Sequence, residues 1–143
     1  MITILPIDYY CFRDVLRSLN KKLEIPTYSD YPNSINWKFI YSDESLLTNY
    51  SKETIKYILI KLRECKFIES HGGTNKGTNV VTPEFIDDIT IKGHSFLINS
   101  TNERVWEMTI GILHNMGNVS LPAFYELMNR CALIISQEYM KRR

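Results

Sequence analysis

The chain has 143 residues, of which 44% are hydrophobic and 23% are charged, and its formal net charge is +1. This composition is ordinary for one soluble globular domain, and a net charge so close to zero argues against strong electrostatic steering of the whole chain toward nucleic acid. No apolar run approaches the ~18 residues that a membrane span needs, so the sequence predicts no contact with a membrane.

The first predicted element is a helix over residues 8–23. Asp8 can cap its N-terminus with the side-chain carboxylate, and apolar residues follow at helical spacing. Pro26 prevents the helix from continuing, and the Pro, Ser, Asp and Asn residues of 26–36 predict a loop. The apolar and aromatic residues 37–41 (WKFIY) then predict a short strand.

The central predicted element is a helix within the stretch 51–69. A short helix over 44–49, which Ser42 or Asp43 can cap, comes before it. Ser51 is a good N-cap for the longer helix, because its hydroxyl can accept from the first free backbone N–H groups. The apolar residues of this helix recur at helical spacing and form one stripe, which comprises Ile55, Ile58, Leu59 and Leu62.

The residues after this helix predict a β-hairpin. Phe67 and Ile68 begin a strand, the sequence HGGTNKGTN supplies glycines and asparagines for a reversal, and Val81 belongs to the return. A capped helix that runs into a strand and a glycine-rich hairpin is the core of a winged-helix domain. We therefore predict an α+β, mainly α fold, in which residues 1–90 form a winged helix-turn-helix-like domain with a small antiparallel sheet.

Residues 91–143 predict a helical extension that packs on this domain as part of a single compact unit. Its three helices each have a capping residue, namely Thr90, Thr101 or Asn102, and Ser120. The last helix contains consecutive apolar residues over 132–135, which is more apolar width than one packing face needs. This surplus predicts either a central buried helix or a homodimer contact, for which Ile135 is the candidate residue.

Three segments of the sequence resemble a known family. They are residues 55–68 (IKYILIKLRECKFI), residues 89–97 (ITIKGHSFL) and residues 104–107 (RVWE). They are similar to an uncharacterised family of small bacterial and phage proteins that share a Gly-His-x-Phe-Leu segment and a later Val-Trp. The resemblance covers roughly residues 50–140. It implies a winged-helix fold and a phage-like origin, and it implies no activity.

Two positions depart from the pattern of that family. Cys65-Lys66 stands where the family usually has Ala-Gly, and Tyr57-Ile58 stands where a Tyr-His pair is common. The family is known only as a domain of unknown function, so these departures bear on local structure rather than on a known site.

The cysteines and the first residues predict the cellular compartment of the protein. The three cysteines are odd in number and lie far apart in helical apolar patterns, which favours reduced core thiols in a cytosolic protein. The opening residues, MITILPIDYY, lack the basic region and the cleavage site of a signal peptide. We therefore expect the cytoplasm of a bacterial host cell.

Catalytic and metal sites are not expected from the sequence. His71, His94 and His114 are too scattered for a metal-ligand spacing, and no Cys-x-x-Cys motif accompanies them. The glycines around Lys76 lack the Walker spacing and the following helix of a phosphate-binding loop. We therefore predict a protein that is not an enzyme and that has no cofactor or metal.

DNA is the first predicted partner, because the winged-helix fold most often binds it. The lysines that could contact DNA from the central helix and the hairpin tip are Lys52, Lys56, Lys61 and Lys76. The helix face opposite the apolar stripe also carries Glu53 and Glu64, which would repel phosphates. We therefore expect a DNA-binding regulator of modest affinity.

A host protein is the alternative partner. Tyr57 and Ile60 lie on the same outward face, and aromatic and aliphatic anchors carry most of the energy of protein interfaces. With Ile135 on the last helix, they are the predicted protein-contact residues. This hypothesis describes an inhibitor that binds a host factor directly, for example an anti-defence protein such as an anti-CRISPR.

Overall fold

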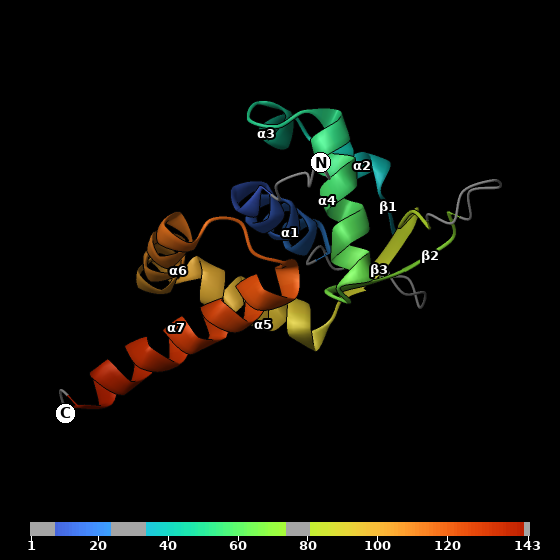
Figure 1. Ribbon diagram of the computed structural model, residues 1–143. Coiled ribbons are helices and arrows are strands. Elements are labelled where there is room, and N and C mark those ends of the chain that lie inside the picture. The colour runs from blue at the N-terminus through green and yellow to red at the C-terminus, as the bar shows by residue number, and fades with distance from the viewer. Residues whose placement is uncertain (1–7, 24–33, 74–80, 142–143) are drawn as a thin grey trace. The chain divides into compact units, whose positions relative to one another are not determined.

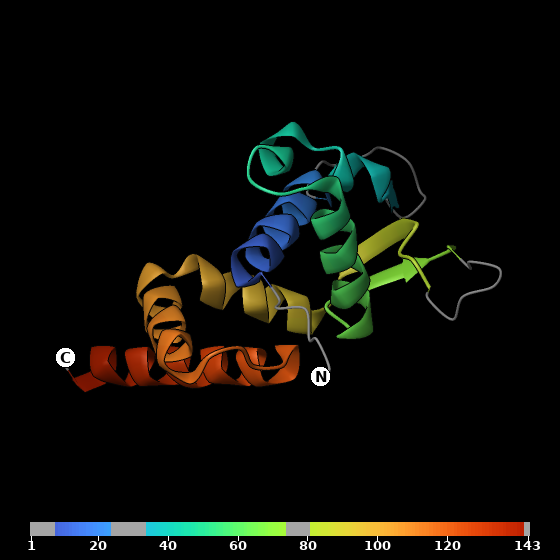
Figure 2. The same ribbon diagram turned by 45° about the horizontal axis from the view of Figure 1, so that its top comes forward.

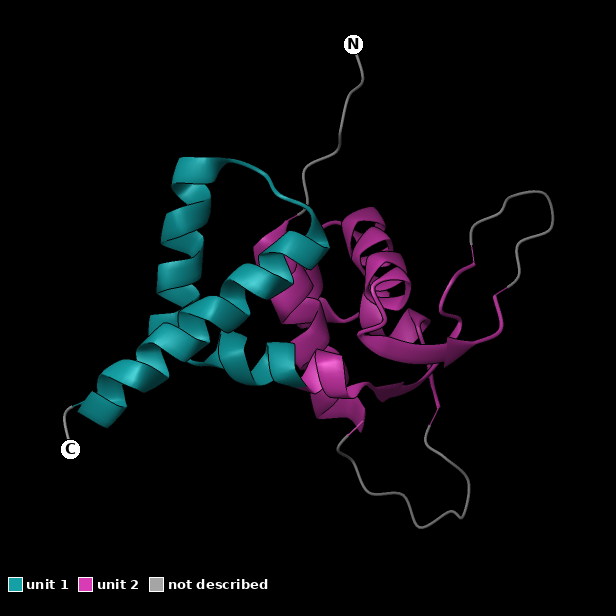
Figure 3. Cartoon of the chain, turned by 60° about the horizontal axis from the view of Figure 1, so that its bottom comes forward, with its two compact units in different colours: residues 1–7, 95–143 teal, residues 8–94 magenta. Residues whose placement is uncertain are grey.

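A computed structural model describes residues 8–23, 34–73 and 81–141 of the protein. These residues form two compact units (Figure 3). The N-terminal unit is Asp8–His94, and the described part of the C-terminal unit is residues 95–141. The fold is mainly helical with a small antiparallel sheet and C-terminal helices, as the sequence predicts.

The N-terminal unit combines short helices with the sheet (Figure 1). Its elements in chain order are α1 (Tyr9–Leu23), β1 (Ile35–Asn36), α2 (Lys38–Tyr41), α3 (Glu44–Leu47), α4 (Lys52–Glu64), β2 (Ile68–His71) and β3 (Phe85–Ile89). The first turn of α5 (Ile91–Thr101) completes the unit.

Side-chain caps begin the helices where the sequence predicts them. The Asp8 carboxylate accepts from the Cys11 backbone N–H at 3.0 Å, and the Asp43 carboxylate accepts from the Ser45 N–H at 3.0 Å. The Ser51 hydroxyl accepts from the Thr54 N–H at 3.1 Å. Each cap satisfies a backbone donor that the first turn of a helix leaves without a partner.

The core of the N-terminal unit lies between α1 and α4, which run side by side (Figures 1 and 2). The α4 stripe, defined as Ile55, Ile58, Leu59 and Leu62, is at most 1% exposed. α1 buries a matching set, which comprises Cys11, Phe12, Val15, Leu16 and Leu19. Phe12 also meets the Phe67 ring edge-on at 5.3 Å, so this core extends to the turn before β2.

The three strands pair in the order β1-β3-β2, and both pairings are antiparallel. Side-chain contacts link the edges of the sheet through Asp87 on β3. Its carboxylate accepts a hydrogen bond from the Ser34 hydroxyl at 2.6 Å and pairs with the His71 ring on β2 at 2.9 Å. These bonds outweigh burial and hold the pKa of Asp87 below its ordinary value. Of the predicted hairpin tip, residues 71–79, His71 ends β2, Gly72 and Gly73 follow with φ of 76° and 78°, and the remainder lies outside the described residues.

The strand predicted over residues 37–41 is wrong. The strand is β1, at Ile35–Asn36, and the chain then turns into α2. The Asn36 side chain accepts from the Lys38 backbone N–H at 3.0 Å, which starts this turn. Trp37 and Tyr41 are four residues apart, and on a helix that spacing brings their rings edge-on at 5.3 Å.

Helix α5 begins by docking against the turn between α4 and β2. The Thr90 hydroxyl accepts from the Gly93 N–H at 3.1 Å and donates to the Lys66 carbonyl at 2.7 Å. A Cβ at Gly93 would lie 2.3 Å from the Phe67 carbonyl oxygen. Glycine is therefore required at this position by the close approach of two backbones.

The C-terminal unit consists of the rest of α5 with α6 (Glu103–Met116) and α7 (Leu121–Lys141). Asn102 caps α6, and Gly117, with a φ of 84°, ends it. Its core contains three edge-on aromatic rings, because Phe124 meets Phe96 at 5.7 Å and Trp106 at 6.2 Å. These contacts join all three helices around one ring.

Alanine substitutions at two helical glycines test the docking of α5. Gly93→Ala adds a Cβ that clashes with the Phe67 carbonyl, so we expect the free energy of unfolding to fall by about 1–3 kcal/mol, as in overpacked cores. Gly111→Ala, where the added Cβ meets open space in α6, should instead stabilise by about 0.5–1 kcal/mol. Urea denaturation followed by circular dichroism measures both, and equal effects would contradict the close approach.

Candidate nucleic-acid interface

Helices α3 and α4 are consecutive, with residues 48–51 between them. Because the α4 stripe faces the core, the other side of α4 is turned outward. Lys52 and Glu53 are exposed there, and Lys56, Tyr57 and Ile60 are half-buried. The first turns of α4 therefore present two lysines, one helical turn apart.

Lys52 and Lys56 lie over aromatic rings of α2. The Lys52 ammonium is 5.0 Å from the centre of the Tyr41 ring, and the Lys56 ammonium is 4.6 Å from the same point. Lys56 is also 5.8 Å from the centre of the Trp37 ring. We refer to Trp37, Tyr41, Lys52 and Lys56 as the aromatic–lysine cluster. Its cation–π contacts orient both ammonium groups.

The aromatic–lysine cluster concentrates positive charge. Two ammonium groups lie within 5.0 Å of one ring centre, and like charges that share a site repel each other. Neither Lys52 nor Lys56 forms an ion pair with a described residue. An anion placed against both lysines would relieve their repulsion, so the cluster is suited to a phosphate group.

Lys61, predicted as a third nucleic-acid contact, has a different setting. Its ammonium donates to the Glu64 carboxylate at 2.9 Å, and it lies 5.4 Å from the centre of the Tyr57 ring. The hydrogen bond to Glu64 raises the pKa of Lys61. The positive charge of Lys61 is therefore matched locally, unlike those of Lys52 and Lys56. Lys76, the fourth predicted contact, lies outside the described residues.

The predicted protein contacts are also unequal. Tyr57 and Ile60 are half-buried on the outward side of α4. Ile135 is only 3% exposed, because it faces the core of the C-terminal unit. The exposed apolar residues beside it are Leu133, at 57%, and Ile134, at 47%. A homodimer contact through this part of α7 would therefore use Leu133 and Ile134 rather than Ile135.

The aromatic half of the cluster is not among the site residues that the sequence analysis predicts. Trp37 and Tyr41 were assigned to a strand, and on a strand residues four apart would not meet above a helix. The pattern that indicates the cluster is the i, i+4 spacing of the two aromatic residues. Lys52 and Lys56 on α4 have the same spacing.

Within residues 8–23, 34–73 and 81–141, no three His, Cys, Asp or Glu side chains come together to hold a metal ion. None of the helices in the described ranges has the length and apolarity of a transmembrane span.

The model of the DUF2513 family, which is described as a hypothetical protein, matches residues 8–119. The chain belongs to the DUF2513 family. This confirms the predicted resemblance to an uncharacterised family. The match begins at residue 8, well before the predicted start near residue 50, and ends before α7. Neither the curated proteins nor the solved structures contain a match.

The residues that carried the resemblance to this family are mostly packing residues. Gly93 is buried against Phe67, while Phe96 and Leu97 are at most 7% exposed. Trp106 is 7% exposed. In this DUF2513 protein these residues therefore explain the fold. They do not indicate a binding site, so a role for the outward side chains of α4 depends on the geometry of those side chains.

Two neighbouring isoleucines test the assignment of α7. Ile135→Glu buries a carboxylate in the core, so we expect a loss of more than about 3 kcal/mol in the C-terminal unit. Ile134→Glu, at a 47% exposed position, should leave that unit folded. Thermal unfolding followed by tryptophan fluorescence measures both variants, since Trp106 lies in the same core. If the wild-type protein is a dimer and the Ile135→Glu variant is a folded monomer, this assignment is contradicted.

Proposed function

We propose that this DUF2513 protein is a winged-helix regulator that binds double-stranded DNA through α4. The order of elements supports the proposal, because α1, β1, α3, α4, β2 and β3 follow one another as in a winged helix, with α2 as an addition. The sheet order β1-β3-β2 is also that of a winged helix, with β2 and β3 joined through the hairpin.

The aromatic–lysine cluster carries the proposal. In a helix-turn-helix, the second helix lies in the major groove and its N-terminal residues contact the base edges. Here α4 is that second helix, and its first turns carry Lys52 and Lys56. Both ammonium groups are oriented by Tyr41 and have no ion pair with a described residue. They are therefore available to phosphate oxygens or to guanine acceptors.

The acidic residues of α4 limit the affinity. Glu53 is exposed beside Lys52, and it would be repelled by a phosphate that approached the first turn. Glu64 is paired with Lys61 at the other end of the helix. The contact therefore depends on two lysines against one glutamate, and we expect modest affinity that falls steeply with salt.

A host protein is the second candidate partner. The observation that favours it is the exposed apolar face of α7, where Leu133, Ile134 and Met140 are between 47% and 76% exposed. Leu133 and Met140 are seven residues apart and therefore lie on one side of α7, while Ile134 lies about 100° around the helix from Leu133, so the exposed apolar surface is wider than one stripe. In this case the protein would be an inhibitor of a host factor, such as an anti-CRISPR.

Charge-neutral variants test the DNA-binding proposal. We expect Lys52→Gln and Lys56→Gln to weaken binding to mixed-sequence duplex DNA on the order of tenfold each, and to make the log–log salt dependence shallower by roughly 0.9 per lysine. Lys61→Gln is the matched control on the same helix, and it should change affinity little because Glu64 already matches its charge. Fluorescence anisotropy with a labelled duplex measures all three.

Two outcomes would contradict the proposal. One is equal weakening by all three variants, which would indicate general charge rather than the cluster. The other is the absence of salt-dependent DNA binding. Affinity capture from bacterial lysate, with and without nuclease, then tests the second candidate, since a protein partner retained after nuclease treatment and lost in Leu133→Glu would support it.

A further inference from the structure

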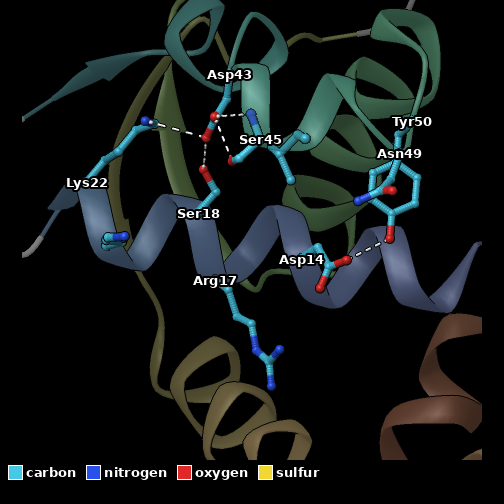
Figure 4. A pocket seen from close by; sticks show the side chains of 10 residues that line it. Asp14, Arg17, Ser18, Lys22, Asp43, Ser45, Asn49 and Tyr50 are labelled. Atoms are coloured by element: carbon cyan, nitrogen blue, oxygen red, sulfur yellow. Dashed lines mark hydrogen bonds and ion pairs between the residues drawn. The ribbon is translucent and has the colours of Figure 1, made fainter.

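A pocket of about 490 Å³ opens between α1 and the segment from Asp43 to Tyr50, which contains α3 (Figure 4). Its volume is in the range of small-molecule sites. The lining is polar apart from Leu46, and it comprises Asp14, Arg17, Ser18, Lys21, Lys22, Asp43, Ser45, Leu46, Asn49 and Tyr50. A polar lining of this kind suits a hydrophilic ligand rather than an apolar one.

Hydrogen bonds hold the two walls of the pocket together at both ends. At one end, Asp43 accepts from the Ser18 hydroxyl of α1 at 2.7 Å and from the Ser45 hydroxyl at 2.8 Å. At the other end, the Tyr50 hydroxyl donates to the Asp14 carboxylate of α1 at 2.6 Å. Figure 4 shows these two links with the hollow between them. The walls are therefore arranged before any ligand binds, which reduces the ordering cost of binding.

The same bonds occupy the two carboxylates. Asp43 accepts from Ser18 and Ser45, and these bonds outweigh burial and lower its pKa. Asp14 accepts from Tyr50, a contact that, after burial, helps to raise the pKa of the Tyr50 hydroxyl. Each carboxylate therefore uses part of its acceptor capacity within the walls, and the lysine ammonium groups are the donors available to a ligand.

Three cations line the pocket against these two carboxylates. Lys22 is 3.5 Å from Asp43, which is longer than a good hydrogen bond and leaves its ammonium able to donate further. Lys21 is exposed and forms no ion pair with a described residue. Burial, followed by repulsion from Arg13, lowers the pKa of Arg17. An anion in the pocket would offset this excess of positive charge.

We propose that this pocket binds a small phosphorylated ligand. The phosphate contacts Lys21 and Lys22, and the polar body of the ligand contacts Ser45 and Asn49. Phosphate fits better than a single carboxylate, because its dianion can accept from several cations at once. A sugar phosphate or a mononucleotide has the required combination of charge and hydroxyl groups.

The location of the pocket suggests what the ligand controls. Its walls are α1 and α3, and α3 is the helix before α4 in the proposed helix-turn-helix. A ligand that contacts both walls stabilises their present arrangement by mass action. A ligand in this pocket would thereby control DNA binding by α4. This control rests on the proposed function, whereas the binding of the ligand to the pocket does not.

Isothermal titration calorimetry without DNA tests the site, with AMP, ribose 5-phosphate and inorganic phosphate as probes at constant ionic strength. We expect at least one phosphate ester to bind the wild-type protein and to raise its melting temperature. Lys21→Gln should weaken that binding on the order of tenfold, roughly the loss of one charged contact. Lys61→Gln is the control and should bind as the wild type does. Adenosine, which lacks the phosphate, should not bind.

Lys22→Arg provides a second variant, because it keeps the charge beside Asp43 and should retain binding if the fold is intact. The proposal is overturned if no phosphate probe binds at about 10 mM, which would mean a binding free energy weaker than roughly 3 kcal/mol. It is also overturned if Lys21→Gln binds the esters as tightly as the wild type does. Both measurements are made without DNA, so their outcome does not depend on whether α4 binds DNA.

Discussion

The four buried side chains of α4 set the rotation of that helix about its own axis. Ile55, Ile58, Leu59 and Leu62 are at most 1% exposed and pack on α1. Successive residues differ by about 100°, so a rotation by one residue would bring either Lys61, or Lys56 with Arg63, into the core. Burying such a charge without a partner costs several kcal/mol. The outward positions of Lys52 and Lys56 follow from this constraint.

Charge is distributed unevenly over a protein whose net charge is only +1. At the start of α4, two lysines share the Tyr41 ring, whereas at its end Lys61 is paired with Glu64. The α1–α3 pocket repeats this imbalance, since its carboxylates are occupied and its lysines retain donors. Local charge therefore indicates sites that the total charge does not.

Local signals predicted most of the fold, and long-range contacts account for what they missed. The caps at Asp43 and Ser51 and the α4 stripe depend on residues at most four apart, and all were recognised. The segment 37–41 was misassigned because a five-residue aromatic run fits a strand or a helix equally well. Consecutive apolar residues do not specify which one is buried, so the sequence left a buried helix and a dimer contact open for Ile135, and the structure buries this side chain. The pocket depends on Ser18 meeting Asp43, which are 25 residues apart, and no local pattern predicts that contact.

Contact between DNA and the first turns of α4 is tested most directly by lysine acylation followed by mass spectrometry. Lys52 and Lys56 should react in the free protein and be protected by duplex DNA at low salt. Lys61 on the same helix and Lys141 at the end of α7 should react to the same extent with and without DNA. Protection of Lys61 or Lys141 in place of Lys52 and Lys56, or unchanged reactivity of all four lysines, would contradict the proposed contact.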